Sequence, residues 1–247
     1  MNKDLSYRLI NIADPTRIYS VLKLNEFLIE NPKFIKKRDL KIASISGGTE
    51  PEIDLFDKDV DITYLNYDDN PNMWDLTKNW EGKEYQYLLG TFDFVFCEQI
   101  LEHLSDPEMA FKNLNLLLKK DGILHCSVPG ICGIHMDPNW YYSGFHPRLL
   151  NKWAKNLNIE IIHSFFWGSP KCAKMYSNCE FTPLVYSGGI EFFLPLFFSL
   201  LKKGKLKILL RVHIPNLLIH NIKYIFQDMW SENFITPVYT VFMGKKR

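Results

Sequence analysis

The 247-residue sequence lacks several features that mark particular classes of protein. Its 29 basic and 28 acidic residues nearly cancel, so no global positive field indicates a nucleic-acid-binding protein. The five cysteines are an odd number without paired spacing, which favours a reducing compartment and speaks against a zinc site. We therefore predict no nucleic-acid partner and no bound metal.

Long hydrophobic runs are also missing. No stretch reaches the roughly 18 uninterrupted apolar residues that a membrane span requires, and residues 1–4 lack the apolar core of a signal peptide. These absences predict a cytoplasmic protein. The 47% hydrophobic content is enough for one full core, so one elaborated domain is expected rather than two independent ones.

Helical and strand patterns alternate along the first two thirds of the chain. A leading helix is predicted over residues 16–29, where apolar residues share one helical face until Asn31-Pro32. Asp106-Pro107-Glu108 predicts the start of another helix, which should close at residues 119–122. Strands are predicted at 40–45, 62–65, 92–97, 123–128, 159–166 and 238–243, with a further helix at 147–157. The pattern predicts an α/β fold with a mostly parallel sheet covered on both faces.

The alternation stops at residue 168 and resumes only near the C-terminus. We therefore divide the chain into an N-terminal helical segment (1–39), a core (40–167), a helical and aromatic insertion (168–234) and a last core strand (235–247). Residues 192–227 contain no acidic residue and combine an apolar run with lysines. Two interpretations stay open: a lid or homodimer contact, which we favour, and a peripheral membrane contact through residues 190–227.

Gly47 and Gly48 follow the first predicted strand. In an open parallel sheet, ligands bind beyond the carboxyl ends of the strands, and glycine lets the main chain approach a ligand closely. On its own, such a pair is just as typical of a tight turn.

The residues from 92 to 129 make the interpretation specific. After the strand at 92–97 comes the run Cys97-Glu98-Gln99-Ile100-Leu101-Glu102-His103-Leu104, followed by a helix, an Asp-Gly turn and a strand that ends at Pro129. This order and spacing resemble the class I S-adenosylmethionine-dependent methyltransferases. The resemblance implies a Rossmann-like, mostly parallel, seven-stranded sheet with helices on both faces and a helical lid inserted before the last strand. It also implies S-adenosyl-L-methionine as the cofactor.

By this resemblance, the residues expected to bind the cofactor are Ser46, Gly47, Gly48, Thr49, Asn66, Tyr67, Asp75, Leu76, Cys97, Glu98 and Gln99. The sequence departs from the family at Ser44, Ser46 and Glu50, which replace an acidic residue and two glycines. Asn66 stands where a carboxylate usually holds the ribose, so the stronger charge-assisted bond is forfeited.

Histidine is the natural base for a hydroxyl acceptor, because methyl transfer needs an aligned nucleophile and gains from proton removal. His135 is the first candidate, followed by His103 and His146, with a structural role open for each. The loop residues Trp140, Tyr141 and Tyr142 are the expected substrate contacts, with packing beneath the insertion as the alternative. We predict O-methylation of a small-molecule acceptor or of a sugar of a polysaccharide.

Two other functions stay open. The departures in the first motif fit a catalytically silent binding protein with the methyltransferase fold. An NAD-dependent dehydrogenase or epimerase would also place a glycine turn after its first strand, with Asp68 near the distance expected of a ribose carboxylate. However, the third glycine of that motif is absent. That function would also leave the segment from Glu98 to His103 unexplained.

Overall fold

The computed structural model describes residues 15–35, 39–45, 52–56, 60–66, 74–82, 85–132, 138–167 and 239–247. The helices are α2 (Pro15–Glu30), α3 (Pro107–Leu117) and α4 (Pro147–Asn156), with short 3₁₀ turns η1 (Ile53–Leu55) and η3 (Leu101–His103). The strands are β1 (Lys41–Ile45), β2 (Asp61–Leu65), β3 (Phe92–Glu98), β4 (Leu118–Pro129), β5 (Ile159–Trp167) and β6 (Tyr239–Lys246). Each strand and helix predicted within these ranges is present.

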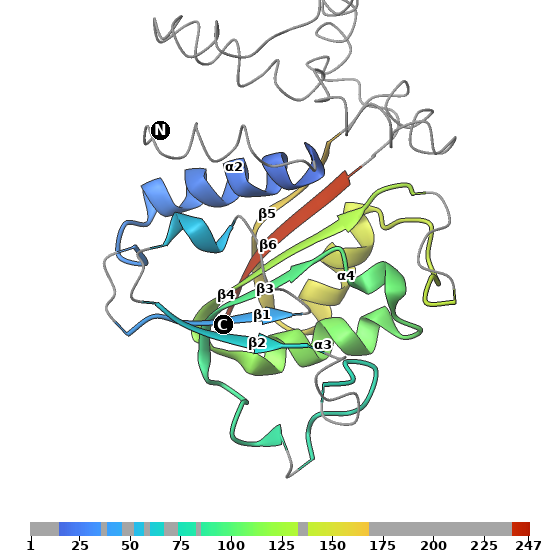
Figure 1. The fold of residues 1–247 in the computed structure, drawn as a ribbon, viewed down its shortest axis with the longest axis horizontal. Coiled ribbons are helices and arrows are strands. Elements are labelled where there is room, and N and C mark those ends of the chain that lie inside the picture. The colour runs from blue at the N-terminus through green and yellow to red at the C-terminus, as the bar shows by residue number, and fades with distance from the viewer. Residues whose placement is uncertain are drawn as a thin grey trace, which may run out of the picture.

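The strands form one sheet in the order β2-β1-β3-β4-β6-β5 (Figure 1). β2, β1, β3 and β4 are parallel, and β6 runs antiparallel to both β4 and β5. The expectation of a mostly parallel sheet is thus confirmed. The expected number of seven strands is not confirmed, because the described residues contain a six-stranded sheet. Between β2 and β3, the described segments 74–82 and 85–91 form turns that bury Trp80 and Tyr85, in place of a further strand.

Helices cover both faces of the sheet, with α2 on one and α3 and α4 on the other (Figure 1). Side chains of a strand alternate between its two faces, so β1 sends Ile42 toward α2 and Ala43 toward α3. The α2 side packs Leu24 and Leu28 against strand residues such as Phe94. We refer below to the α2 face and the α3/α4 face.

The beginning of α3 agrees with the sequence prediction, but its end does not. Asp106 Oδ1 accepts a hydrogen bond from Met109 N at 3.0 Å, which caps the first turn. The helix then ends at Leu117, before the predicted 119–122, because Leu118 already pairs with Phe92 in the sheet. Lys246 Nζ, from the far end of the chain, bonds the Leu118 carbonyl oxygen at 2.8 Å.

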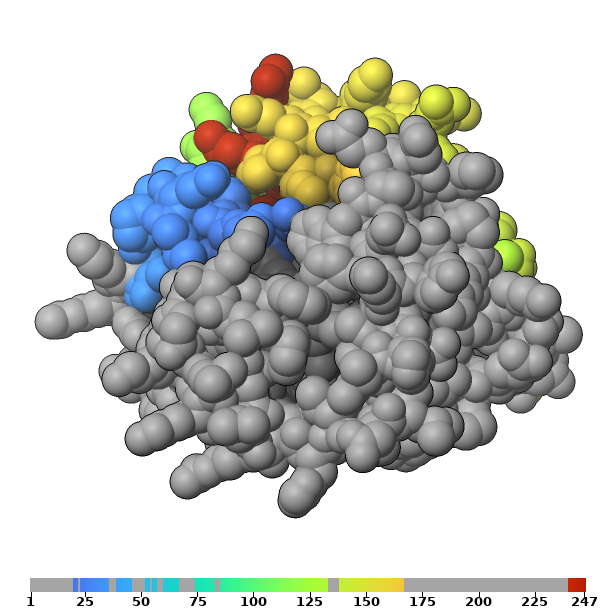
Figure 2. All heavy atoms as spheres, turned by 90° about the horizontal axis from the view of Figure 1, so that it is seen from above, coloured from blue at the N-terminus to red at the C-terminus, as the bar shows by residue number. Residues whose placement is uncertain are grey.

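The first described helix and the last strand lie side by side. Met243 of β6 packs with Leu24 and Leu28 of α2, and Figure 2 shows atoms of the two segments adjoining at the surface. The insertion at 168–234 and its expected helical lid lie outside the described residues. Among the described helices, none has the length and apolar character of a membrane span.

Candidate functional site

The carboxyl ends of three parallel strands meet at one edge of the sheet. Ile45 of β1 pairs with Leu65 of β2 and with Cys97 of β3, so the residues that follow these strands emerge together. This is the edge at which an open α/β sheet binds ligands. The predicted glycine turn, Ser46 to Thr49, starts directly after β1 but lies outside the described residues, as do Tyr67 and His135.

Asn66 follows β2 at this edge. Its Oδ1 atom is buried and has no hydrogen-bond partner among the described residues. A buried amide oxygen costs free energy unless it accepts a hydrogen bond, and a ribose hydroxyl is a donor of the right kind. Asn66 therefore remains our prediction for the ribose contact.

Asp75 and Leu76 have structural roles in the described residues. The Asp75 carboxylate accepts bonds from Thr77 N at 2.9 Å and Thr77 Oγ1 at 2.6 Å, which closes a local turn. Leu76 is buried, and its carbonyl oxygen accepts a bond from Asn113 Nδ2 at 2.8 Å. Their contact with the adenine stays a prediction from the resemblance.

Cys97, Glu98 and Gln99 end β3 in three different orientations. Cys97 is buried in the core on the α3/α4 face, whereas Glu98 points to the α2 face. Gln99 has a left-handed backbone with φ 58°, and its N–H donates to Ser127 O at 2.9 Å. Its Nε2 atom is buried without a hydrogen-bond partner among the described residues, so this amide is the one of the three that suits a cofactor contact best.

Glu98 belongs to a buried polar cluster that the sequence analysis missed. Ser127 Oγ donates to Glu98 Oε2, and Ser20 Oγ lies 3.3 Å from the same oxygen and 2.7 Å from His125 Nε2. His125 Nε2 is 3.5 Å from Glu98 Oε1, and Glu52 is also fully buried beside them. We call Ser20, Glu52, Glu98, His125 and Ser127 the Glu98 cluster. One signal in the sequence could have revealed this cluster: α2 and β4 carry polar residues at positions that the apolar periodicity assigns to the core.

His125 is neutral at physiological pH. Burial, assisted by the nearby His163, lowers the pKa of His125 to about 3. Its neutral imidazole can accept a hydrogen bond or bind a metal ion through one ring nitrogen.

The loop after β4 is fixed to the segment after β3. Tyr141 N and Tyr142 N both donate to the Glu102 carbonyl oxygen, at 3.0 and 3.2 Å. His103 Nδ1 lies 2.7 Å from Asn139 O. These bonds place the predicted substrate loop beside the predicted cofactor segment.

The aromatic rings of this loop are available at the surface. Tyr141 is 52% exposed and Tyr142 36% exposed, and the Trp140 Nε1 atom is buried. Under them, the Glu102 side chain is fully buried, and burial raises its pKa to about 8 despite a bond to its own backbone. Glu102 is therefore largely protonated at neutral pH.

His146 serves the fold. Its Nδ1 accepts a bond from Arg148 N at 3.1 Å and so caps α4, and its ring centroid lies 6.0 Å from that of Phe166. Of the described histidine candidates, His103 is thus the one that lies at the carboxyl edge of the sheet without a helix-capping role.

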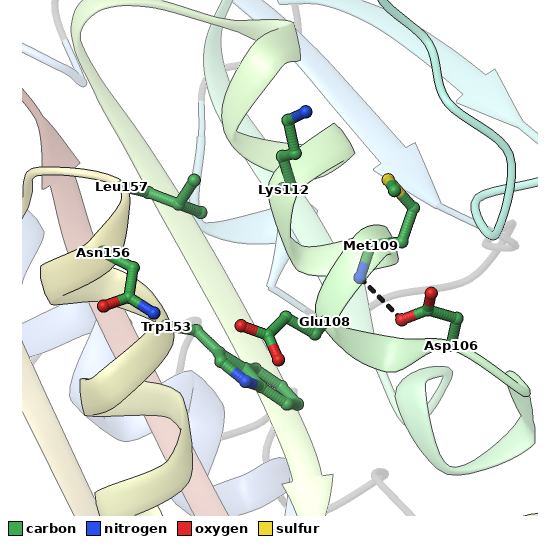
Figure 3. Close-up of a pocket in the computed structure, with 7 residues that line it drawn as sticks. All are labelled: Asp106, Glu108, Met109, Lys112, Trp153, Asn156 and Leu157. Carbon is green, nitrogen blue, oxygen red and sulfur yellow. Dashed lines mark hydrogen bonds between the residues drawn. The ribbon is translucent and has the colours of Figure 1, made fainter.

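A separate hollow of about 270 Å³ lies between α3 and α4. Its lining residues include Glu108, Lys112 and Trp153, with the Glu108 carboxylate and the Trp153 indole close together (Figure 3). None of the predicted site residues lines this hollow, so the candidate site is the carboxyl edge of the sheet.

Comparison with known proteins bears on the fold and the site. A family model described as a methyltransferase domain matches residues 19–166. No curated protein sequence matches the chain.

Among solved structures, a candidate sarcosine dimethylglycine methyltransferase from Galdieria sulphuraria is 15% identical, with 91% of this chain and 85% of that chain covered and a TM-score of 0.48. A SAM dependent methyltransferase from Archaeoglobus fulgidus is 13% identical, with 92% and 94% covered and a TM-score of 0.46. Nothing about the acceptor of the present chain follows from either.

Proposed function

Because the chain belongs to the class I S-adenosylmethionine-dependent methyltransferase family, we propose that it methylates a hydroxyl oxygen of a small-molecule or glycan acceptor. The family match covers residues 19–166 and makes S-adenosylmethionine the cofactor. The target oxygen and the class of acceptor are the proposal.

The observation that carries this proposal is the attachment of the aromatic loop to the segment after β3. Two backbone bonds from Tyr141 and Tyr142 to Glu102 hold the loop at the edge where the cofactor is expected. Exposed aromatic rings stack on sugar and small-molecule rings, and their polar ends bond hydroxyls. A ring-shaped acceptor held there would lie beside the expected methyl group.

A histidine is the proposed base. His135 remains the first candidate, and the described geometry also suits His103. Because Asn139 O can only accept, His103 Nδ1 carries the proton, which makes Nε2 the basic nitrogen. In the reaction, the acceptor oxygen attacks the methyl carbon in line, the carbon–sulfur bond breaks toward sulfur, and the hydroxyl proton passes to the histidine.

The test is transfer of a deuterated methyl group from labelled S-adenosylmethionine to a panel of sugars, phenols, isoprenoid alcohols and amines, read by mass spectrometry. We expect label on oxygen, and we expect Tyr141→Ala to lower kcat/KM by about tenfold or more through lost stacking while S-adenosylhomocysteine binding is unchanged. Tyr87→Ala is the matched control, since Tyr87 is 58% exposed on another segment.

Three outcomes would overturn parts of this proposal. Label only on amines would exclude O-methylation. Cofactor binding without transfer to any acceptor would favour the silent binding protein. Unchanged turnover in both His135→Ala and His103→Ala would remove the histidine base.

Three further expectations also remain proposals: a cytoplasmic location, a homodimer, and peripheral membrane contact through residues 190–227. Flotation with anionic liposomes at low salt tests the membrane contact, and sedimentation tests the dimer.

A further inference from the structure

The Glu98 cluster brings three metal-ligating side chains together from separate parts of the chain. Glu52 precedes η1, Glu98 ends β3 and His125 lies within β4, yet one ligand atom from each lies within 4.8 Å of the others. All three side chains are buried. We propose that this cluster binds one divalent transition-metal ion of the Zn²⁺ type, with Glu52, Glu98 and His125 as ligands.

The distances fit such an ion. Zn²⁺ binds imidazole nitrogen and carboxylate oxygen at about 2.0–2.2 Å, so two ligands of a tetrahedral ion lie about 3.3–3.6 Å apart. His125 Nε2 and Glu98 Oε1 are 3.5 Å apart. The third ligand, from Glu52, lies within 4.8 Å of both.

The chemistry of the donors selects the ion. One neutral imidazole with two carboxylates suits Zn²⁺ and its neighbours in the first transition row, whereas Mg²⁺ and Ca²⁺ prefer oxygen ligands alone. A divalent ion would also offset the cost of burying two carboxylates in the interior.

The two serines complete the site. Ser127 Oγ donates to Glu98 Oε2, which orients the carboxylate so that Oε1 faces His125. Ser20 Oγ lies 2.7 Å from His125 Nε2 and 3.3 Å from Glu98 Oε2, so its hydroxyl would be the fourth donor to the ion. Since Ser20 belongs to α2, the ion ties this helix to the sheet. The proposed site shares Glu98 with the expected cofactor segment, and it departs from the sequence-based expectation of no metal.

The experiment uses the full chain, stripped with a chelator and titrated with Zn²⁺ in a calorimeter. We expect one ion per chain, retained through gel filtration and measured by elemental analysis. Glu52→Gln and His125→Gln keep side-chain size but remove a ligand, and each should weaken Zn²⁺ binding at least about tenfold. Glu81→Gln is the matched control: Glu81 is exposed, pairs with Lys112 away from the cluster, and its variant should bind as the wild type does.

Folding of each variant is checked by circular dichroism. A Co²⁺ titration of the wild type then provides a readout that needs no variant: an intense visible spectrum indicates a four-coordinate ion, and a weak one indicates six-coordinate binding and contradicts the site. The proposal is also overturned if the folded wild type retains no Zn²⁺, or if Glu52→Gln and His125→Gln both retain full affinity, which would place the ion elsewhere. Activity with S-adenosylmethionine enters none of these readouts, so failure here leaves the methyltransferase proposal standing.

Discussion

The two faces of the sheet bury different kinds of side chain. On the α3/α4 face, the buried strand residues are apolar from Ala43 in β1 to Phe242 in β6, with the exception of Thr240, whose hydroxyl donates to Phe145 O at 2.9 Å. On the α2 face, an equally apolar half around Phe94 gives way to the Glu98 cluster toward the carboxyl ends of the strands. Buried polar groups stabilise a fold less than apolar packing does, and the gathering of five of them in the Glu98 cluster agrees with the metal site proposed above.

The α3/α4 face is also where the buried Glu102 lies, next to the core residue Leu101. Its folded-state pKa of about 8 exceeds the unfolded value of about 4.5, so the protonated form favours the folded state. The stabilisation of the folded state by the protonated Glu102 carboxyl is fully present below about pH 4.5 and is lost as the pH rises to about 8. The total loss is about 5 kcal/mol at most, at about 1.4 kcal/mol per pKa unit. We predict that this loss of stability with rising pH is absent in Glu102→Gln. Denaturant unfolding of both proteins at several pH values measures it.

The exposed Glu108→Gln serves as the control for Glu102→Gln and should leave the pH dependence unchanged. If the free energy of unfolding of wild type and Glu102→Gln fell equally between about pH 5 and pH 8, Glu102 would not be the protonated group.

Phe111 tests the apolar character of the α3/α4 face. Its ring centroid lies 5.4 Å from that of Phe242 and 5.6 Å from that of Trp153, and the side chain is fully buried. Phe111→Ala leaves a cavity and should lower the free energy of unfolding by about 3–5 kcal/mol, with cofactor affinity of the folded protein unchanged. Leu149→Ala, at an exposed position of α4, should change it by less than about 0.5 kcal/mol. Equal losses in the two variants would contradict the packing described for this face.

Ser20 tests the α2 face, and its replacement should cost less stability than the replacement of Phe111. Ser20→Ala removes the hydroxyl between His125 Nε2 and Glu98 Oε2, a net loss of about 1 kcal/mol for a buried neutral hydrogen bond. Chemical denaturation in the presence of a chelator measures it. A loss as large as that of Phe111→Ala would show that the cluster is a main source of stability, and the contrast between the faces would then fail.

Local sequence signals predicted most of the fold. Apolar patterns predicted the α2 helix and the strands. The Asp106 cap was also predictable, because its carboxylate bonds the backbone N–H of Met109, only three residues further along the chain. The end of α3 was wrong because it is set by contacts with Phe92 and Lys246, which are remote in sequence. Such contacts carry no local signal.

The site was predicted less completely for the same reason. The motif after β3 identified the carboxyl edge, and the structure adds the bonds that fix the loop of Tyr141 and Tyr142 to Glu102. The Glu98 cluster joins Ser20 to His125 across 105 residues, so neither residue looked unusual in its own segment. His146 was considered a base candidate on residue type, and only the structure shows its role as a helix cap.

Calorimetric titration of the full chain with S-adenosylhomocysteine tests most directly whether the edge beyond β1, β2 and β3 is a cofactor site. We expect one binding site per chain, with an affinity that falls when Gln99 is replaced by alanine and does not fall when the exposed Tyr87 is replaced. The absence of any binding heat at high micromolar protein, with the chain shown to be folded, would contradict it.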